Sequence, residues 1–403
     1  MVTQAMIELF LPAIDGSRLE TVQAAELVDG RAGLPLLEDG EFLFGGNPAA
    51  AAALNRWRLV HLHKDNLAFQ TVQISTGADH PARNVSYLGY KTIEEEITAS
   101  AGKKITPRKY LVKYYDNEAK TSGTCHFGSI HLKEYMAHAL QNLFAPGTTH
   151  DDIPYRLVEI IVKKEFPRLA RDPALLVALC DASLMDMHPA RLFFRTLERM
   201  KESPKQNFKD VNAVYDFAFR NVNFSDGQGT KTVYSLYEDM AKSAITEFRD
   251  SLKAEIFKNN VQWFEMLIGE AKELRLNHRG FFTRLVSSPG TFSGDFHRIF
   301  GALGIPFTTN EDSHGYFIPP AKLSSLKIQS YFPKVFKAIC KTYNGKLPCE
   351  LHPFCAAGEE GTVKKITDDQ CLKAPWARVS LPTLCPNAQM WKTWGLADFK
   401  PSV

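Results

Sequence analysis

The longest regular pattern in the sequence is an apolar stripe at helical spacing over residues 232–277. Apolar side chains recur along it three or four residues apart, as on one face of an α-helix. The adjacent Asn259 and Asn260 predict a break, so we interpret the stretch as two helices. A face this wide and this rich in Phe and Leu needs other helices to cover it, which predicts that the pair forms the centre of a helical core.

Further helical patterns surround this stripe. We predict helices from Ile130 to Phe144, from Pro154, from Pro173, from Pro189, from Val211 to Phe219 and from Ser293 to Leu303. Proline is tolerated in the first turn of a helix because the N–H that it lacks has no partner there, and Asp172 is positioned to cap the helix that begins at Pro173. Residues 129–303 are therefore predicted to form a multi-helix bundle.

The chain before residue 129 is predicted to be a mixed α/β part over residues 47–128, preceded by an N-terminal arm or short strands over residues 1–46. Asp-Gly and Gly-Gly turn signals separate short apolar runs in residues 1–46. Asn47-Pro48 opens a predicted helix to about Val60, and Ile93–Ala99 is predicted as a short helix. The strand candidates are Thr71–Ile74, Asn84–Tyr90 and Tyr110–Tyr115, the last followed by an Asp116-Asn117 turn.

The chain after residue 303 is predicted to contain a hairpin and a helix, over residues 304–343, and then an irregular tail. Ile305–Pro319 has two β-favouring runs around a polar turn, and Tyr331–Tyr343 is predicted as helix. Residues 344–403 are rich in Pro and Cys and show little periodicity, so we predict an irregular segment packed by Trp376, Trp391 and Trp394 or docked on another copy. The predicted fold class is mainly α, in a two-lobed arrangement.

Composition and charge narrow the class of protein. The opening residues have no basic region followed by an apolar core, and no apolar run is long enough to span a bilayer, so we expect an intracellular protein without a membrane partner. Residues 1–102 carry 7 Lys and Arg against 13 Asp and Glu, whereas residues 103–209 carry 18 against 12. This contrast indicates an anionic partner or contact between copies, unless it is an ordinary variation in surface charge.

A cysteine-rich stretch near the end of the sequence offers ligands for a metal. Cys349, His352 and Cys355 are spaced three residues apart, with Cys371 and Cys385 downstream. Cys and His are the ligands of tetrahedral structural zinc, although this spacing is not that of a familiar zinc finger. The alternative is that these are reduced, buried cysteines, and no other cofactor is expected.

Catalytic motifs do not appear in the sequence. We find no Gly-x-Ser-x-Gly elbow, Walker loop or His-Glu-x-x-His zinc motif. His131 and His138 share a predicted helix face, and Asp151-Asp152 lies in a predicted loop without an identifiable partner. Gly227-Gln228-Gly229 before Lys231 could hold a phosphate, but a plain turn is the simpler interpretation. The sequence therefore favours a protein without catalytic activity, with an enzyme built from scattered residues as an alternative.

Basic residues cluster in three places. The first cluster interleaves cations with aromatic rings, the second lies at one helix end, and the third follows one helix face at spacings of four. Their members are Lys103, Lys104, Arg108, Lys109, Tyr110, Lys113 and Tyr114; Lys163, Lys164 and Arg168; and Arg191, Arg195 and Arg199. Cations suit phosphates and rings suit bases, so we hypothesise a basic groove between the mixed part and the bundle that binds a nucleic-acid backbone. Ordinary solvated faces are the alternative.

These patterns together predict a non-enzymatic protein that coats nucleic acid, RNA rather than DNA, and self-associates through residues 1–46 and 344–403. This arrangement resembles the nucleoproteins of RNA viruses, in which RNA lies in a basic cleft between lobes and terminal arms exchange between neighbours. The resemblance is architectural and assigns no residues. The alternatives are a viral or phage shell or scaffold protein, a nucleic-acid-processing enzyme, and a winged-helix DNA-binding protein built from Phe281–Ile318.

Overall fold

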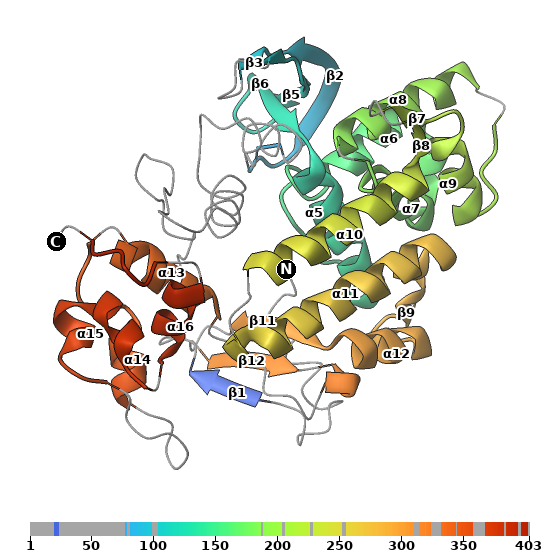
Figure 1. The fold of residues 1–403 in the computed structure, drawn as a ribbon. Helices are drawn as coiled ribbons and strands as arrows, with labels where there is room; N and C mark the ends of the chain where they lie inside the picture. Colours follow the sequence, from blue (N-terminus) through green and yellow to red (C-terminus); the bar gives the residue numbers. More distant parts are fainter. Residues whose placement is uncertain are drawn as a thin grey trace. The chain divides into compact units, whose positions relative to one another are not determined.

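A computed structural model gives the structure of the chain. It describes residues 20–23, 77–78, 81–98, 104–186, 188–203, 206–225, 229–251, 255–309, 314–318, 320–323, 332–343, 345–357, 367–382, 384–393 and 396–401. This part of the chain is mainly α-helical with small antiparallel sheets, so the prediction of a mainly α fold is confirmed (Figure 1). The described residues contain no helix that is both long and apolar enough to cross a membrane.

Two compact units make up the structure, and neither is a continuous stretch of sequence. Unit 1 comprises residues 1–62, 243–268 and 299–403, and unit 2 comprises residues 63–242 and 269–298. The boundaries after residues 242, 268 and 298 fall inside helices α10 (Val233–Ser251), α11 (Lys258–Asn277) and α12 (Gly294–Leu303). The compact units thus do not follow the linear order of the predicted segments.

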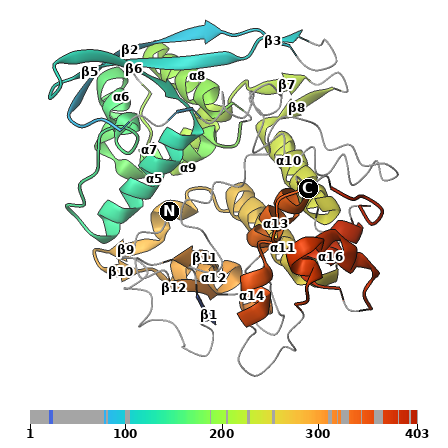
Figure 2. The same ribbon diagram turned by 90° about the vertical axis from the view of Figure 1, so that its left-hand side faces the viewer.

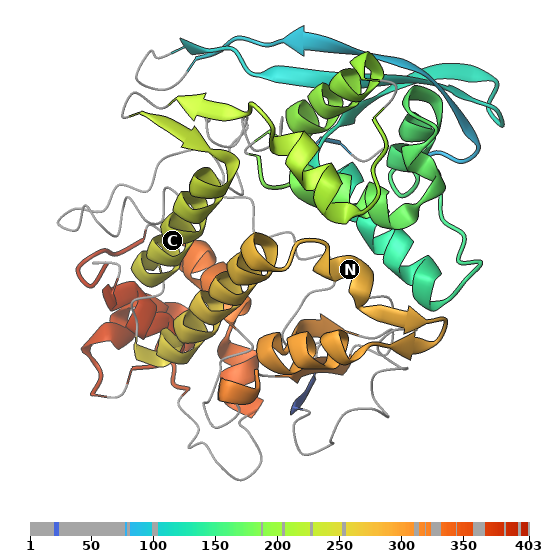
Figure 3. The ribbon, with the colours of Figure 1, turned by 90° about the vertical axis from the view of Figure 1, so that its right-hand side faces the viewer.

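Unit 2 contains an antiparallel sheet with helices on one face (Figures 2 and 3). Its strand order is β2 (Val85–Glu94), β5 (Arg108–Asp116), β6 (Thr121–Phe127). Side chains alternate between faces along a strand, and the inner face carries buried Tyr87, Tyr110, Val112, Cys125 and Phe127. Helices α6 (Leu157–Glu165) and α8 (Pro189–Glu202) pack on this face.

Helix α7 (Pro173–Ser183) is the centre of unit 2. Asp172 caps it, accepting a hydrogen bond from the Ala174 N–H at 2.9 Å, as predicted. Every residue from Leu175 to Ser183 is buried, so this helix is covered by protein on all sides. Helices around it are α5 (Ser129–Phe144), α6 (Leu157–Glu165), α8 (Pro189–Glu202) and α9 (Val211–Phe219). Four of these five helices match the predicted starts, whereas α6 begins three residues after the predicted Pro154.

The stripe over residues 232–277 does form two helices, α10 and α11, but it is not the most deeply buried part of the described chain. The side chains of Met240 and Phe248 are 38% and 36% exposed, whereas Leu179 in α7 is fully buried. The break also lies earlier than predicted, because α10 ends at Ser251 and Asn259 and Asn260 lie in the first turn of α11.

A buried polar network joins α7, α9, α10 and α11 within unit 2. Asp181 accepts hydrogen bonds from the Tyr215 hydroxyl at 2.7 Å and from Arg275 Nε at 3.0 Å. Arg275 Nη1 in turn donates to the Tyr237 hydroxyl at 2.8 Å. Burial would lower the pKa of Arg275, but the charge of Asp181 and these hydrogen bonds raise it. The ion pair is therefore the main polar connection between these helices.

Two predicted helices are wrong. The predicted helix Ile93–Ala99 is extended instead: β2 continues to Glu94, and β3 (Ile97–Thr98) pairs with β4 (Lys104–Ile105). Its β-branched residues gain cross-strand partners that local propensity does not anticipate. The winged-helix alternative needs a helix over Phe281–Val286, but this segment forms a short 3-10 helix, Phe281–Arg284, followed by a hairpin of β9 (Val286–Ser288) and β10 (Thr291–Phe292). The helix-turn-helix that a winged helix requires is thus absent from these residues.

The remaining strands were either not predicted or predicted only in part. Strand β6 was not predicted, and neither were β7 (Asn223–Ser225) and β8 (Thr230–Thr232), which pair with each other. In unit 1, β1 (Glu20–Gln23) pairs with β12 (His314–Ile318), which pairs with β11 (Ile305–Thr309), so the predicted hairpin after residue 304 is confirmed.

Trp391 is fully buried in an apolar cluster of unit 1 and Trp376 packs against this cluster, so the predicted packing by these two residues is confirmed. Helix α13 (Phe332–Tyr343) matches the predicted helix, and the residues predicted as irregular also contain short helices. These are α14 (His352–Ala357), α15 (Gln370–Lys373), a 3-10 helix over Pro375–Ser380 and α16 (Pro386–Thr393). The predicted helix to Val60, the strand Thr71–Ile74, most of residues 1–46, Gly227-Gln228 and Trp394 lie outside the described residues.

Candidate functional site

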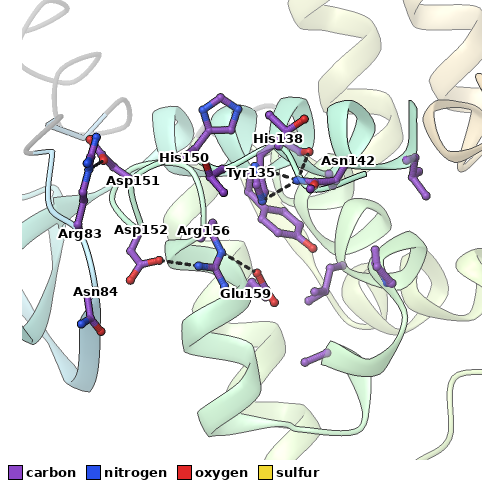
Figure 4. A pocket seen from close by; sticks show the side chains of 18 residues that line it. Arg83, Asn84, Tyr135, His138, Asn142, His150, Asp151, Asp152, Arg156 and Glu159 are labelled. Carbon is purple, nitrogen blue, oxygen red and sulfur yellow. Dashed lines mark hydrogen bonds and ion pairs between the residues drawn. The ribbon is translucent and has the colours of Figure 1, made fainter. Parts of the chain in front are cut away.

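A cavity with a volume of about 870 Å³ lies beside α5 in unit 2 (Figure 4). Helix α5 contributes one wall, the connection from α5 to α6 a second, and the segment that enters β2 a third. The polar side chains that line it are Arg83, Asn84, Tyr135, His138, Asn142, Thr148, Thr149, His150, Asp151, Asp152, Arg156 and Glu159. Convergent polar groups in a concave pocket make it the default ligand site.

Backbone contacts hold these walls together. Ala82 and Ile153 exchange two backbone hydrogen bonds, of 3.3 and 3.0 Å. The Val85 N–H donates to Asp152 Oδ2 at 2.8 Å, and the side chain of Arg83 pairs with Asp151. The segment that enters β2 is therefore fixed against the connection from α5 to α6.

Arg156 lies between two carboxylates on one side of the cavity (Figure 4). Its Nη1 donates to Asp152 Oδ1 at 2.9 Å, and its Nε lies 3.4 Å from Glu159 Oε2. Burial would raise the pKa of Glu159, but Lys163 and Arg156 lower it overall. The charges of this side are thus paired with one another, which leaves hydrogen bonding as the main way to recognise a ligand.

Two histidines, His138 and His150, also line the cavity. The ring centroids of His138 and His150 are 5.3 Å apart, and His150 stacks on Tyr155 while its Nε2 lies 2.8 Å from Gln141 Oε1. Burial, with smaller effects from His150 and Arg156, lowers the pKa of His138. His138 is therefore neutral at pH 7 and able to accept a proton.

The sequence alone did not identify this cavity. Asp151 and Asp152 find their partners Arg83 and Arg156 only in the folded chain. His131, which shares a helix face with His138, takes no part: it is fully buried, stacks on Phe127 and accepts a hydrogen bond from the Gly128 N–H through Nδ1. The run of polar residues from Thr148 to Asp152 was the available signal.

The basic and aromatic residues of β5 divide between two faces of the sheet. Lys109 and Lys113 lie on the outer face, whereas Arg108, Tyr110 and Tyr114 alternate to the inner face. Tyr110 is 7% exposed and stacks on Phe194 with ring centroids 5.3 Å apart. Because its ring is covered, Tyr110 has no face on which a base could stack, contrary to the sequence-based prediction.

Tyr114 also packs inward. A Cβ added to Gly123 would lie 2.5 Å from its ring, so the ring covers the glycine. Lys103 lies outside the described residues, and Lys104 belongs to β4. Arg108 pairs with Glu94 at 3.0 Å, and Lys109 pairs with Glu95.

The three arginines of α8 contact protein groups beside α9. Arg191 pairs with the buried Asp186 at 2.7 Å. Arg195 and Arg199 lie 3.5 and 3.4 Å from backbone carbonyls of Asn221 and Ala218, and burial lowers the pKa of Arg199, followed by the charges of Arg195 and Arg220. Lys163 pairs with Glu159, while Lys164 and Arg168 are exposed. Helix α8 packs on the inner face of the sheet, so its arginines and the outer lysines do not line one groove.

The cysteine-rich stretch does come together. Cys349, His352, Cys355, Cys371 and Cys385 line one small cavity in unit 1. Burial, and then the neighbouring thiols, raises the pKa of Cys355 to about 12. Among the described residues, no three His, Cys, Asp or Glu side chains are already placed as ligands of one metal ion.

The fold and these sites define a mainly α-helical protein with a polar cavity, a basic sheet face and a thiol cluster. No protein-family model, curated protein or solved structure matches the chain.

Proposed function

We propose that the protein binds single-stranded nucleic acid, RNA in the first instance, along the outer face of the sheet β2-β5-β6. The observation that carries this proposal is the register of the strands. It places Lys91 beside Leu111 and His126, and Lys113 beside Thr124, with Lys109 and Tyr115 on the same face. Two lysines four residues apart on β5, a third lysine on the neighbouring β2 and a ring together suit a phosphate backbone with unstacked bases.

The electrostatics of this face support the proposal. The acidic residues of the three strands, Glu94 and Asp116, alternate to the inner face. Among the described residues, neither Lys91 nor Lys113 has a carboxylate partner, and both side chains are exposed. Leu88, at a bulge of β2, is 58% exposed and adds apolar area beside them. A polyanion would therefore meet Lys91 and Lys113 without displacing an ion pair, whereas Lys109 on the same face is paired with Glu95.

The proposed binding does not read sequence, because lysines contact phosphates rather than base edges. A protein of this kind coats RNA, as the resemblance to viral nucleoproteins implies, and its complexes dissociate as salt rises. Light scattering and the 260/280 nm absorbance ratio, measured before and after nuclease treatment, test whether the purified protein coats RNA. Particles whose mass and 260/280 nm ratio both fall after the treatment support the proposal.

Fluorescence anisotropy with a labelled oligouridine tests the binding face. The variant Lys91→Glu/Lys113→Glu removes two phosphate contacts. Each contact contributes roughly 0.7 to the steepness of log affinity against log salt concentration, so this plot should become less steep by about 1.4. The control Lys133→Glu/Lys209→Glu changes the net charge equally at two exposed lysines elsewhere in unit 2. Equal losses in both variants, or no loss in the first, would refute the assignment.

The cavity beside α5 supports a second candidate function, the binding of a small polar molecule and its conversion by acid–base chemistry. The observation in favour is a neutral, 7% exposed His138 beside His150 in a cavity of about 870 Å³. Because the charges there are already paired, an uncharged or zwitterionic ligand fits best. Thermal-shift screening of such compounds on the wild-type chain and on His138→Ala tests it; a ligand that stabilises both equally would not use this cavity.

A further inference from the structure

Four cysteines from separate segments of unit 1 meet around one cavity. Cys349 precedes α14, Cys355 lies within it, Cys371 lies in α15 and Cys385 directly precedes α16. The cavity has a volume of about 10 Å³. This is space for roughly one water-sized sphere, so it admits an ion but no organic ligand.

Hydrogen bonds fix the segments and point donors at the sulfurs. The Cys349 N–H donates to the Cys371 carbonyl at 2.9 Å, which joins two segments directly. Asn387 Nδ2 donates to Cys349 Sγ at 3.2 Å, and the Ala388 N–H lies 3.5 Å from Cys385 Sγ. Donors of this kind stabilise a thiolate and orient it, as the outer shell of a metal site does.

A buried cation lies beside the same sulfurs. Arg378 is 4% exposed, lines the cavity, pairs with Asp368 at 2.5 Å and hydrogen-bonds Cys385. Four thiolates around a divalent ion carry a net negative charge, which an adjacent guanidinium offsets. The surroundings of the thiols therefore suit a charged cluster better than four neutral thiols in an apolar core.

The segments that carry the cysteines also need a constraint. Helices α14 and α15 have six and four residues, and helices this short are not stable without tertiary support. A metal that links several short segments contributes its binding free energy to their folding. The apolar cluster beneath them includes Cys349 and Leu351, so the site continues the core around Trp391.

We propose that Cys349, Cys355, Cys371 and Cys385 together bind one zinc ion as a structural tetrathiolate site. Zinc draws the four sulfurs inward by rotation of their side chains and displaces their protons. His352 lines the cavity but is not a ligand, because four thiolates complete the tetrahedron. This assignment replaces His352 of the sequence-based ligand set by Cys385.

Elemental analysis of the full chain tests the site. We expect one zinc per chain after dialysis, released when a mercurial reagent modifies the thiols. Cobalt in place of zinc should give the visible absorption bands of a tetrahedral thiolate complex. Wild-type protein that contains no zinc and gives no such bands, or that contains a disulfide among these four cysteines, would overturn the proposal.

Variants test the ligand set. Cys371→Ser and Cys385→Ser should each lose most of the zinc, whereas Cys125→Ser and Cys180→Ser, which alter buried cysteines of unit 2, should keep it. His352→Ala should also keep one zinc per chain with unchanged cobalt bands. Full zinc in Cys385→Ser, or loss of zinc in His352→Ala, would show that the four-cysteine assignment is wrong. The wild-type cobalt spectrum decides the matter even if a serine variant does not fold.

Discussion

Replacing Asp181 by Asn should destabilise unit 2 by about 3 to 5 kcal/mol, the range measured when one partner of a buried ion pair is removed. Asp181 is 1% exposed and Arg275 is 22% exposed, so the variant leaves a largely buried guanidinium without its counter-charge. Tyr215 can still donate to the side-chain carbonyl of the introduced amide, so the loss comes chiefly from the charge. We expect a loss of stability near the lower end of this range, because the Arg275 side chain remains partly exposed to solvent and keeps its hydrogen bond to the Tyr237 hydroxyl.

Urea unfolding followed by far-UV circular dichroism and by Tyr and Trp fluorescence measures this loss. The control is Asp216→Asn, which removes the partner of Arg279 at a carboxylate that is 65% exposed. An exposed pair contributes at most about 1 kcal/mol, so the control should change little. The double variant Asp181→Asn/Arg275→Met should lose at least about 1 kcal/mol less than the sum of the two single variants. Additive losses, or equal losses in Asp181→Asn and Asp216→Asn, would refute the reasoning.

Two further predictions concern the cavity and the central helix. Burial lowers the pKa of His138 below its ordinary value of 6.5, so as the pH falls His138 is protonated in the unfolded chain before it is protonated in the folded chain. The stability due to neutral His138 is therefore present above pH 6.5 and is lost below it. Stability measured from pH 7.5 to 5 should therefore fall less steeply in His138→Gln than in the wild type, and parallel curves would contradict this. Asp172→Ala removes the cap of α7 and should cost about 1 kcal/mol in urea unfolding, whereas Asp172→Asn, which can still accept the Ala174 N–H, should cost much less.

Local signals in the sequence predicted most of the helices. Asp172 followed by Pro173 marks the start of α7 correctly, because capping depends only on neighbouring residues. The helix predicted over Ile93–Ala99 failed because strand pairing with residues further along the chain outweighed its local propensity.

The sites depended on contacts that no local pattern encodes. Arg83 and Asp151 meet across 68 residues of sequence, and Val85 and Asp152 across 67. The faces of β5, in contrast, could have been predicted: alternation alone separates Lys109 and Lys113 from Tyr110 and Tyr114. The sequence-based prediction assigned these residues to one binding surface because they are close in sequence. In the folded strand they lie on opposite faces of the sheet. The cysteines are brought together by tertiary folding, since their spacing matches no familiar zinc motif.

The interleaved composition of the two units sets an order for their completion during synthesis. Unit 2 has all its residues once position 298 has left the ribosome, whereas unit 1 needs residues after 298 to add to its first segment. Strand β1 is synthesised early, whereas its partner β12 is synthesised only after the whole of unit 2. Glu20 therefore cannot pair with Phe317 until then. An unpaired strand edge invites wrong partners for as long as it is open. The interval in which a nascent chain is most exposed to mispairing therefore includes the time taken to translate the whole of unit 2, and slowing translation within that unit lengthens it.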